Sequence, residues 1–393
     1  MSFSFNIEKE LIGTRARAGV ITTPNGEIKT PSFVVVGTKA TVKSLSPEEV
    51  KGLGGQVVLA NTYHLYLEPG EERVKRSGGL HSFMNWDGPT MTDSGGFQAF
   101  SLGVAYGAGI GKLLKKESKE IEEEEKTPPL AKITEDGVAF KSHIDGSEHF
   151  FTPEKSINIQ QSLGADIIFS FDECTSPYAT HEYQKEALLR THRWAERSLN
   201  AHQKEISKQA LFGIVQGGRH NELRKESAQF MVSLPFDGFG IGGSFEKEDI
   251  DKAVGLVNDI LPKQKPRHLL GIGEPEDLFN GIEQGVDTFD CVAPTRIARN
   301  GQLYTKNGKI NILNAKFKDD LSTLDDGCGC FACENYTRAY LAHLFRAKEL
   351  YGLRLASIHN LYFIVHLVNS IRDSILDGTF HKLKKNFFAG YGK

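Results

Sequence analysis

The run Asp-Ile-Ile-Phe-Ser-Phe-Asp at residues 166–172 is a short apolar stretch that ends on a carboxylate. Similar stretches, rich in β-branched and other apolar residues, recur outward from it, and each ends on a small or polar residue. They cover residues 32–37, 57–61, 90–93, 211–216, 238–242, 268–273 and 286–290, which makes about eight with the first. Short strands that are apolar throughout are typical of a parallel sheet covered on both faces.

Stretches with helical periodicity lie between most of these strands. They cover residues 153–163, 182–208, 221–232, 247–261 and 275–284. Strands that alternate with helices indicate a parallel α/β sheet. Eight such units predict a (β/α)8 TIM barrel, and a doubly wound open sheet is the alternative.

Polar residues or glycines follow the carboxyl ends of the predicted strands, which form the active-site face of a barrel. They are Asn61, Asp93, Asp172, Gln216, Gly242, Gly243 and Asp290. Any one of them is explained equally well as a cap for the next helix. The whole set favours one functional site at the mouth of the barrel.

The composition is that of an ordinary globular protein, with 393 residues, 39% of them hydrophobic, and a net charge of -3. This charge excludes a globally basic nucleic-acid-binding protein, so a nucleic-acid partner requires a local basic patch. Five cysteines without a paired pattern indicate a reducing compartment. The first residues lack a signal-peptide pattern and no apolar run approaches a membrane span. We therefore expect a soluble, cytoplasmic protein.

Three of the five cysteines, Cys328, Cys330 and Cys333, fall within six residues, and His359 follows after a helical stretch. Three thiolates and one imidazole form a complete tetrahedral zinc set without an open position, so we expect a structural Zn²⁺. A disulfide pair with a buried thiol is the alternative. Residues 301–313 alternate like a hairpin, and residues 338–353 are predicted to form the helix that leads to His359.

These features predict one catalytic barrel over residues 1–393, with a hairpin and zinc-binding subdomain at about 301–365. The segment 103–137 carries lysines, a run of glutamates and two prolines. Such a composition is typical of a solvated insertion.

Five motifs occur in order along the chain, and the last of them is the cysteine cluster. They are Thr-Asp-Ser-Gly-Gly-Phe-Gln (92–98), Ser-Phe-Asp-Glu-Cys-Thr (170–175), Gly-Ile-Val-Gln-Gly-Gly (213–218), Phe-Asp-Cys-Val-Ala-Pro-Thr-Arg (289–296) and Cys-x-Cys-x2-Cys…His. Together they closely resemble the tRNA-guanine transglycosylases of the bacterial type, essentially from end to end.

This resemblance implies an enzyme of queuosine biosynthesis, a pentosyltransferase that exchanges guanine at position 34 of tRNAs with a GUN anticodon (Asp, Asn, His, Tyr) for a 7-deazaguanine. The incoming base is expected to be preQ1, and a queuine-salvaging exchanger is the alternative. The resemblance also implies a covalent enzyme–tRNA intermediate, one structural Zn²⁺ per subunit and a homodimer that binds one tRNA.

The resemblance assigns roles to individual residues. Asp290 matches the nucleophile, and Asp93 matches the general acid/base. The alternatives for these two are a helix cap and a turn residue. The remaining matches are Phe97, Asp172, Gln216, Gly242, Gly243 and Ser244 for binding the base, and Arg296, Arg299 and Lys306 for binding tRNA.

The chain departs from the family pattern at two places near the base pocket. Residues 242–248 read Gly-Gly-Ser-Phe-Glu-Lys-Glu, and His268 replaces a family tyrosine. Three rival hypotheses remain: a non-catalytic tRNA-binding zinc subunit, an archaeal-type exchanger and an unrelated zinc hydrolase. Retention of Asp93 and Asp290 argues against the first, and the closed ligand set argues against the third.

Overall fold

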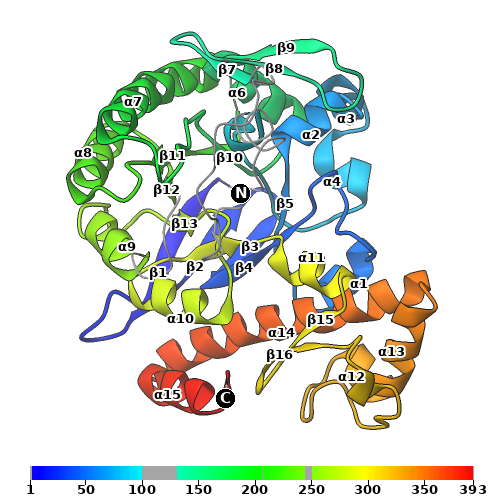
Figure 1. Ribbon diagram of the computed structural model, residues 1–393. Helices are drawn as coiled ribbons and strands as arrows, with labels where there is room; N and C mark the ends of the chain where they lie inside the picture. The colour runs from blue at the N-terminus through cyan, green and yellow to red at the C-terminus, as the bar shows by residue number, and fades with distance from the viewer. Residues whose placement is uncertain (1, 100–130, 206, 244–249, 393) are drawn as a thin grey trace.

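A computed structural model of the chain describes residues 2–99, 131–205, 207–243 and 250–392 (Figure 1). Its centre is a closed barrel with the strand order β10-β11-β12-β13-β14-β4-β5-β6, in which all neighbours are parallel. The strands are β4 (Ser32–Val36), β5 (Val58–Ala60), β6 (Thr90–Thr92), β10 (Ile167–Phe169), β11 (Ala210–Val215), β12 (Gly238–Ile241), β13 (Arg267–Leu269) and β14 (Thr288–Asp290). The predicted barrel is confirmed, and the open-sheet alternative is wrong.

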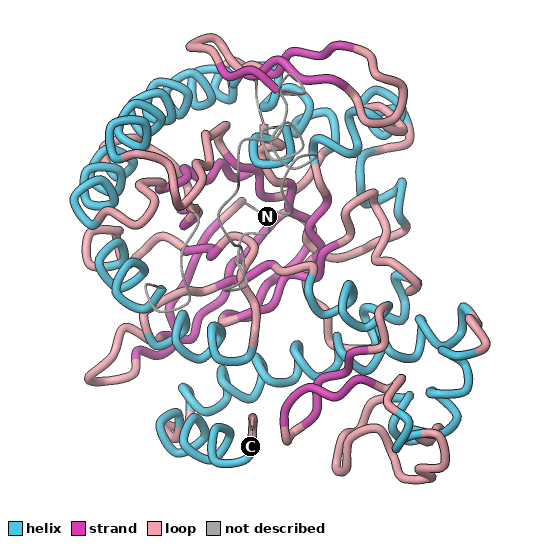
Figure 2. Tube along the Cα trace, viewed as in Figure 1, coloured by secondary structure: helices cyan, strands magenta, loops and turns pink. Residues whose placement is uncertain are grey.

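Helices surround the strands, as Figure 2 shows. They include α1 (Pro47–Gly52), α2 (Thr62–Leu67), α3 (Glu71–Arg76), α4 (Gly79–Met84), α6 (Pro153–Leu163), α7 (His181–Gln203), α8 (Asn221–Val232), α9 (Ile250–Asn258) and α10 (Pro275–Glu283). The bounds of α6 and α8 agree with the prediction. Helix α7 ends before the predicted residue 208, where the Gln209 side chain donates hydrogen bonds to the carbonyls of Gln160 and Ala165 and turns the chain toward β11.

An antiparallel sheet of β1 (Ser4–Glu10), β2 (Arg17–Thr23) and β3 (Gly26–Thr30) covers the amino end of the barrel. Ile21 and Ile28 of this sheet share one apolar cluster with Ile167 and Phe212 of the barrel strands. Asn25 also bonds to Asp166 at the start of β10. Because this end is covered, the carboxyl end with its polar residues is left as the mouth.

The C-terminal region contains the predicted hairpin, as strands β15 (Gln302–Thr305) and β16 (Gly308–Asn311). The remaining elements are α11 (Ala293–Arg299), η1 (Ala315–Phe317), α12 (Phe331–Asn335), α13 (Arg338–Arg346), α14 (Leu350–Leu376) and α15 (Phe380–Gly390). The prediction of one helix over residues 338–353 was wrong. Lys348 has a positive φ of 57°, which separates α13 from α14, and His359 lies inside α14.

The segment 103–137 was predicted to be solvated. Residues 103–130 lie outside the described residues. The remainder forms β7 (Ala131–Ile133), which pairs with β8 (Val138–Lys141) and, through it, β9 (Glu148–Phe151). The Glu135 carboxylate pairs with Arg193, and its carbonyl accepts from the Trp194 indole at 2.7 Å. This end of the segment is therefore bound to α7, and Glu135 itself is exposed.

Across the described ranges, no helix combines the length and the apolar character that crossing a bilayer requires.

A buried ion pair joins the N-terminal sheet to the barrel. Arg17 donates to both carboxylate oxygens of Asp287, at 2.8 and 2.6 Å, and the two side chains are 2% and 0% exposed. Asp287 also accepts from the backbone amide of Arg267 at 2.8 Å. Removal of one partner would leave an uncompensated buried charge.

We expect Asp287→Ala to lower the free energy of unfolding by about 3–5 kcal/mol, measured by urea denaturation. The matched control is Asp259→Ala, because Asp259 forms a similar two-bond pair with Arg15 at the surface. That change should cost no more than about 1 kcal/mol. Equal losses in the two variants would contradict a special role for burial.

Candidate active site and metal centre

Asp172 and Gln216 follow the neighbouring strands β10 and β11 and are both buried. Ser94 Oγ donates to Asp172 Oδ1 at 2.8 Å, and Gln216 Nε2 donates to Asp172 Oδ2 at 2.7 Å. The two predicted base-binding side chains are therefore in direct contact. Hydrogen bonds to neighbours hold the carboxylate in one orientation before any ligand arrives.

A hydrogen bond and an ion pair hold the side chain of Glu173, the residue after Asp172. Its buried carboxylate accepts from the Tyr183 hydroxyl at 2.7 Å and forms an ion pair with Arg190. Burial, and then the hydrogen bond to Glu173, raise the pKa of Tyr183 to about 12. The Tyr183 hydroxyl is protonated at neutral pH, and its hydrogen bond to Glu173 stabilises the segment that carries Asp172.

Gly242 and Gly243 follow β12 and leave no room for a side chain. A Cβ on Gly242 would lie 2.7 Å from Gln216 Nε2, and one on Gly243 would lie 2.4 Å from Arg224 Nη2. Gly243 also has a φ of +109°, in the region that favours glycine. Glycine here keeps the backbone close to the Asp172–Gln216 pair. Ser244, the next predicted base-binding residue, lies outside the described residues.

Arg224, on α8, supports this pocket and was missed by the sequence analysis. It is fully buried, and it donates to the carbonyls of Gly218 at 2.7 Å and Gly242 at 3.1 Å. The guanidinium thus ties together the loops that follow β11 and β12. The sequence could have indicated that Arg224 is buried, because it lies on the inward-facing side of α8 with Leu223 and Ser227.

Asp93 follows β6 and is partly buried. The backbone amide of Thr62, in the first turn of α2, donates to Asp93 Oδ1 at 2.9 Å, and the side-chain amide of Asn61 donates to Oδ2. Asn61 itself follows β5. Two successive residues after β5 therefore orient the predicted general acid/base, which follows the neighbouring strand β6. Phe97, predicted to stack on the base, is partly buried and lies four residues later.

Asp290 ends β14 and its side chain is 15% exposed. Its Oδ1 accepts from the backbone amide of Gly271 at 2.8 Å and lies 3.1 Å from Nε2 of His268. Because an ionised carboxylate only accepts, Nε2 of His268 carries the hydrogen. Nδ1 then accepts from the Thr288 hydroxyl, at 2.9 Å. The imidazole is fully buried and orients the predicted nucleophile, a role that the sequence analysis did not assign.

The mouth of the barrel thus brings together Asn61, Asp93, Asp172, Gln216, Gly242, His268 and Asp290, from seven of the eight strand ends. The predicted tRNA-binding arginines follow Asp290 closely in the chain. Helix α11 follows β14 and carries Arg296, which is exposed, and Arg299, which is partly buried. Burial, and then the charge of Arg296, lower the pKa of Arg299.

Lys306, the third predicted tRNA-binding residue, is exposed in the turn between β15 and β16. Its Nζ pairs with the Asp326 carboxylate at 2.8 Å, and this hydrogen bond raises the pKa of Lys306. A phosphate at this position would compete with Asp326.

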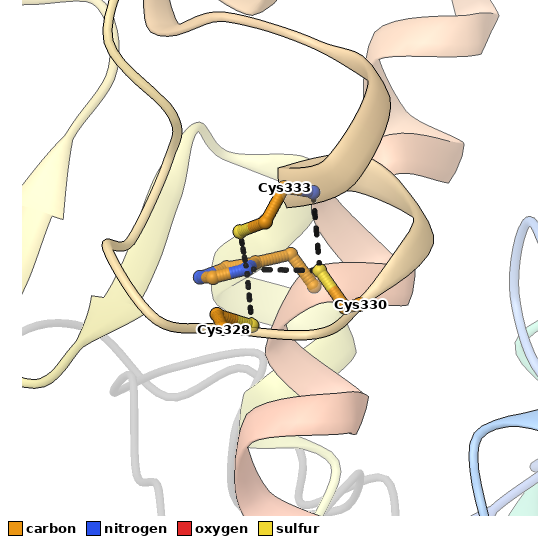
Figure 3. Close-up of side chains that lie close together, drawn as sticks. Cys328, Cys330 and Cys333 are labelled. Atoms are coloured by element: carbon orange, nitrogen blue, oxygen red, sulfur yellow. Dashed lines mark hydrogen bonds between the residues drawn. The ribbon is translucent and has the colours of Figure 1, made fainter.

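The predicted metal ligands meet in the C-terminal region, where Figure 3 shows the three cysteines around a common centre. Nδ1 of His359 lies 3.9, 3.4 and 3.3 Å from the sulfurs of Cys328, Cys330 and Cys333. Tetrahedral zinc ligands lie about 3.4–3.6 Å from one another. The cluster can therefore hold a metal ion. None of the five cysteines forms a disulfide, so the disulfide alternative is wrong.

The hydrogen bond of the second ring nitrogen of His359 determines which tautomer the imidazole adopts. Nε2 lies 2.6 Å from the carbonyl of Tyr304 in β15, and a carbonyl only accepts. Nε2 must carry the hydrogen, so Nδ1 presents its lone pair to the cysteines. A backbone carbonyl in this position is a usual outer contact of a metal-bound imidazole.

Comparison with known proteins gives a consistent result. The family model described as Queuine tRNA-ribosyltransferase matches residues 12–393. The chain is 49% identical over 394 residues to the queuine tRNA-ribosyltransferase of Thermoanaerobacter pseudethanolicus, covering 100% of this chain and 98% of that protein. It is 50% identical over 390 residues to that of Desulforamulus reducens, covering 98% of each. The chain belongs to the queuine tRNA-ribosyltransferase family.

Proposed function

We propose that this chain is a tRNA-guanine transglycosylase that replaces guanine at position 34 of GUN-anticodon tRNAs with preQ1 by double displacement. The observation that carries the proposal is the mouth of the barrel. Two carboxylates, Asp93 and Asp290, are each oriented by hydrogen-bond donors on either side of the Asp172–Gln216 pair. Family membership supports the same reaction.

In the first displacement the Asp290 carboxylate attacks C1′ of the target ribose. The bond from C1′ to N9 breaks, its electron pair leaves with guanine, and Asp93 supplies the proton that the departing base needs. In the second displacement Asp93 takes the proton from N9 of the incoming base, which attacks C1′ and releases Asp290. Two inversions give net retention, as in retaining glycosidases.

The Asp172–Gln216 pair suits the edge of a guanine-type base. The Asp172 carboxylate accepts from Ser94 and Gln216, and an ionised carboxylate is the natural acceptor for the ring imino and amino groups of such a base. The Gln216 amide has two N–H groups, and one of them already holds Asp172. The second suits the purine carbonyl oxygen, together with the backbone amide of Gly243. Phe97 and Ser244 complete the proposed pocket.

The flipped nucleotide must be positioned by the RNA around it. Arg296 and Arg299, three residues apart on α11, face one side of the helix and suit the nucleotides that flank the target. Lys306 suits a phosphate. We further propose a cytoplasmic homodimer, built from a single catalytic barrel whose C-terminal subdomain supplies part of the dimer contact.

The Cys328, Cys330, Cys333 and His359 cluster is proposed to bind one structural Zn²⁺ per subunit. Three sulfurs and one nitrogen favour zinc over hard cations and leave no position for a substrate. When bound, the ion supplies folding energy to the C-terminal subdomain and takes no part in base exchange.

Incorporation of labelled guanine into a tRNA-Tyr transcript tests the reaction. We expect wild type to exchange the base and Asp290→Asn to lose at least about 10³-fold in rate, because the nucleophile is gone. A chase of the labelled tRNA with preQ1 and with queuine identifies the preferred base. Folded, metal-loaded wild type without exchange would reject the enzyme and favour an accessory tRNA-binding subunit.

His268→Phe tests the orientation of the nucleophile. Loss of a hydrogen bond to a charged group should lower kcat about 10- to 100-fold, with the KM for tRNA nearly unchanged. His268→Gln, which keeps an N–H at a similar reach, should recover part of the rate. Single-turnover formation of the covalent intermediate is the measurement. Equal kcat in Phe and Gln variants would show that the imidazole only fills space.

Cys330→Ser tests the metal centre. We expect loss of the bound zinc by mass spectrometry and a lower Tm, because metal binding contributes to folding. Cys174→Ala is the control, since Cys174 is also buried but is not one of the four ligands. It should retain the metal. A metal-free Cys330→Ser protein with the wild-type Tm would contradict a structural role.

A further inference from the structure

A second group of metal-type ligands lies on the same face as the mouth of the barrel, apart from the cysteine cluster. It consists of His181, His220 and Glu222, whose ligand atoms all lie within 4.8 Å of one another. His181 Nε2 lies 3.1 Å from Glu222 Oε1, and His220 Nδ1 lies 3.8 Å from the same oxygen. Two imidazoles from different elements thus converge on one carboxylate.

The backbone explains why these side chains meet. His181 is the first residue of α7, after the Thr180 cap, while His220 caps α8 and Glu222 lies in its first turn. Both helices follow strands that carry base-pocket residues, β10 with Asp172 and β11 with Gln216. The three ligands therefore bridge the two βα loops that form the proposed pocket.

The two loops are in close contact. A Cβ on Gly218 would lie 1.7 Å from Oε1 of Gln184, so the loop after β11 packs directly on the first turn of α7. Arg224 donates to the Gly218 carbonyl at 2.7 Å, and the His220 amide donates to the Gly217 carbonyl at 3.1 Å. The positions of His181 and His220 are thus set by buried contacts and not by the ion pair alone.

The geometry suits an ion. Nitrogen and oxygen ligands at about 2.1 Å from a tetrahedral metal lie about 3.4 Å apart. The two nitrogen–oxygen distances, 3.1 and 3.8 Å, lie on either side of that value, and the two histidine nitrogens lie within 4.8 Å of each other. His181, His220 and Glu222 are 44%, 33% and 64% exposed, so water can complete the coordination.

We propose that His181, His220 and Glu222 form a second, exchangeable site for a divalent transition metal such as Zn²⁺, Ni²⁺ or Co²⁺. Two imidazoles exclude Mg²⁺ and Ca²⁺ as preferred ions, because those cations select oxygen ligands. The bound ion clamps the α7 and α8 loops together beside Asp172 and Gln216. The proposal of this site rests neither on the exchange reaction nor on the cysteine cluster.

Equilibrium dialysis of the folded protein against Zn²⁺ tests the site. Wild type should bind one equivalent more than His181→Ala or His220→Asn, and asparagine retains a good helix cap at position 220. Loss of one ligand should weaken this equivalent by at least about 10-fold. The difference between variants does not depend on how full the cysteine cluster is.

His381→Ala is the matched control. His381 is an exposed histidine that faces the Glu283 carboxylate at 3.9 Å, but this pair lacks a second imidazole among the described residues. This variant should keep the extra equivalent, and its Tm should rise with Zn²⁺ as that of wild type does. Equal zinc binding by wild type, His181→Ala and His220→Asn would overturn the proposal and leave a plain histidine–glutamate ion pair.

Discussion

Hydrogen bonds between β14 and β4 close the barrel, and the rest of the molecule depends on this closure. Asp290 is in register with Val34, so a residue late in the chain is fixed beside one of the first strands. Strands β5, β6, β10 and β11 continue the ring. Closure therefore places the Asp290 nucleophile of the proposed transglycosylase on the same face as Asp93 and the Asp172–Gln216 pair.

Hydrogen bonds between residues of the proposed pocket fix its geometry. Gln216 holds Asp172, Arg224 holds the loops of Gly218 and Gly242, and His268 holds Asp290. Each of these bonds joins residues at least six positions apart in the chain. A polar site assembled in this way needs little reorganisation when a substrate binds, which is the condition for electrostatic stabilisation of a transition state.

The sequence was sufficient to predict the eight strands, because buried parallel strands are apolar throughout and each ends on a polar residue. It was also sufficient for the metal cluster, where ligand type and spacing are diagnostic. It did not predict the N-terminal sheet, whose strands carry many charges, or the break at Lys348. The roles of Arg224 and His268 depend on partners that only the folded chain brings near. A local pattern could place Arg224 on the buried side of α8, but it could not assign either role.

Asn360 is the neighbour of His359 in the proposed metal site, and it connects that site to the helix that carries the proposed tRNA-binding arginines. Its amide donates to the carbonyls of Pro294 and Gln302 and accepts from the amide of Tyr304. Pro294 lies in the helix that presents Arg296 and Arg299, whereas the proposed base-binding residues Asp172, Gln216 and Gly242 follow β10, β11 and β12. In the proposed function, tRNA and the free base are therefore bound by separately supported parts of the barrel. Loss of the proposed metal site would then weaken the binding of tRNA before it weakens the binding of the free base.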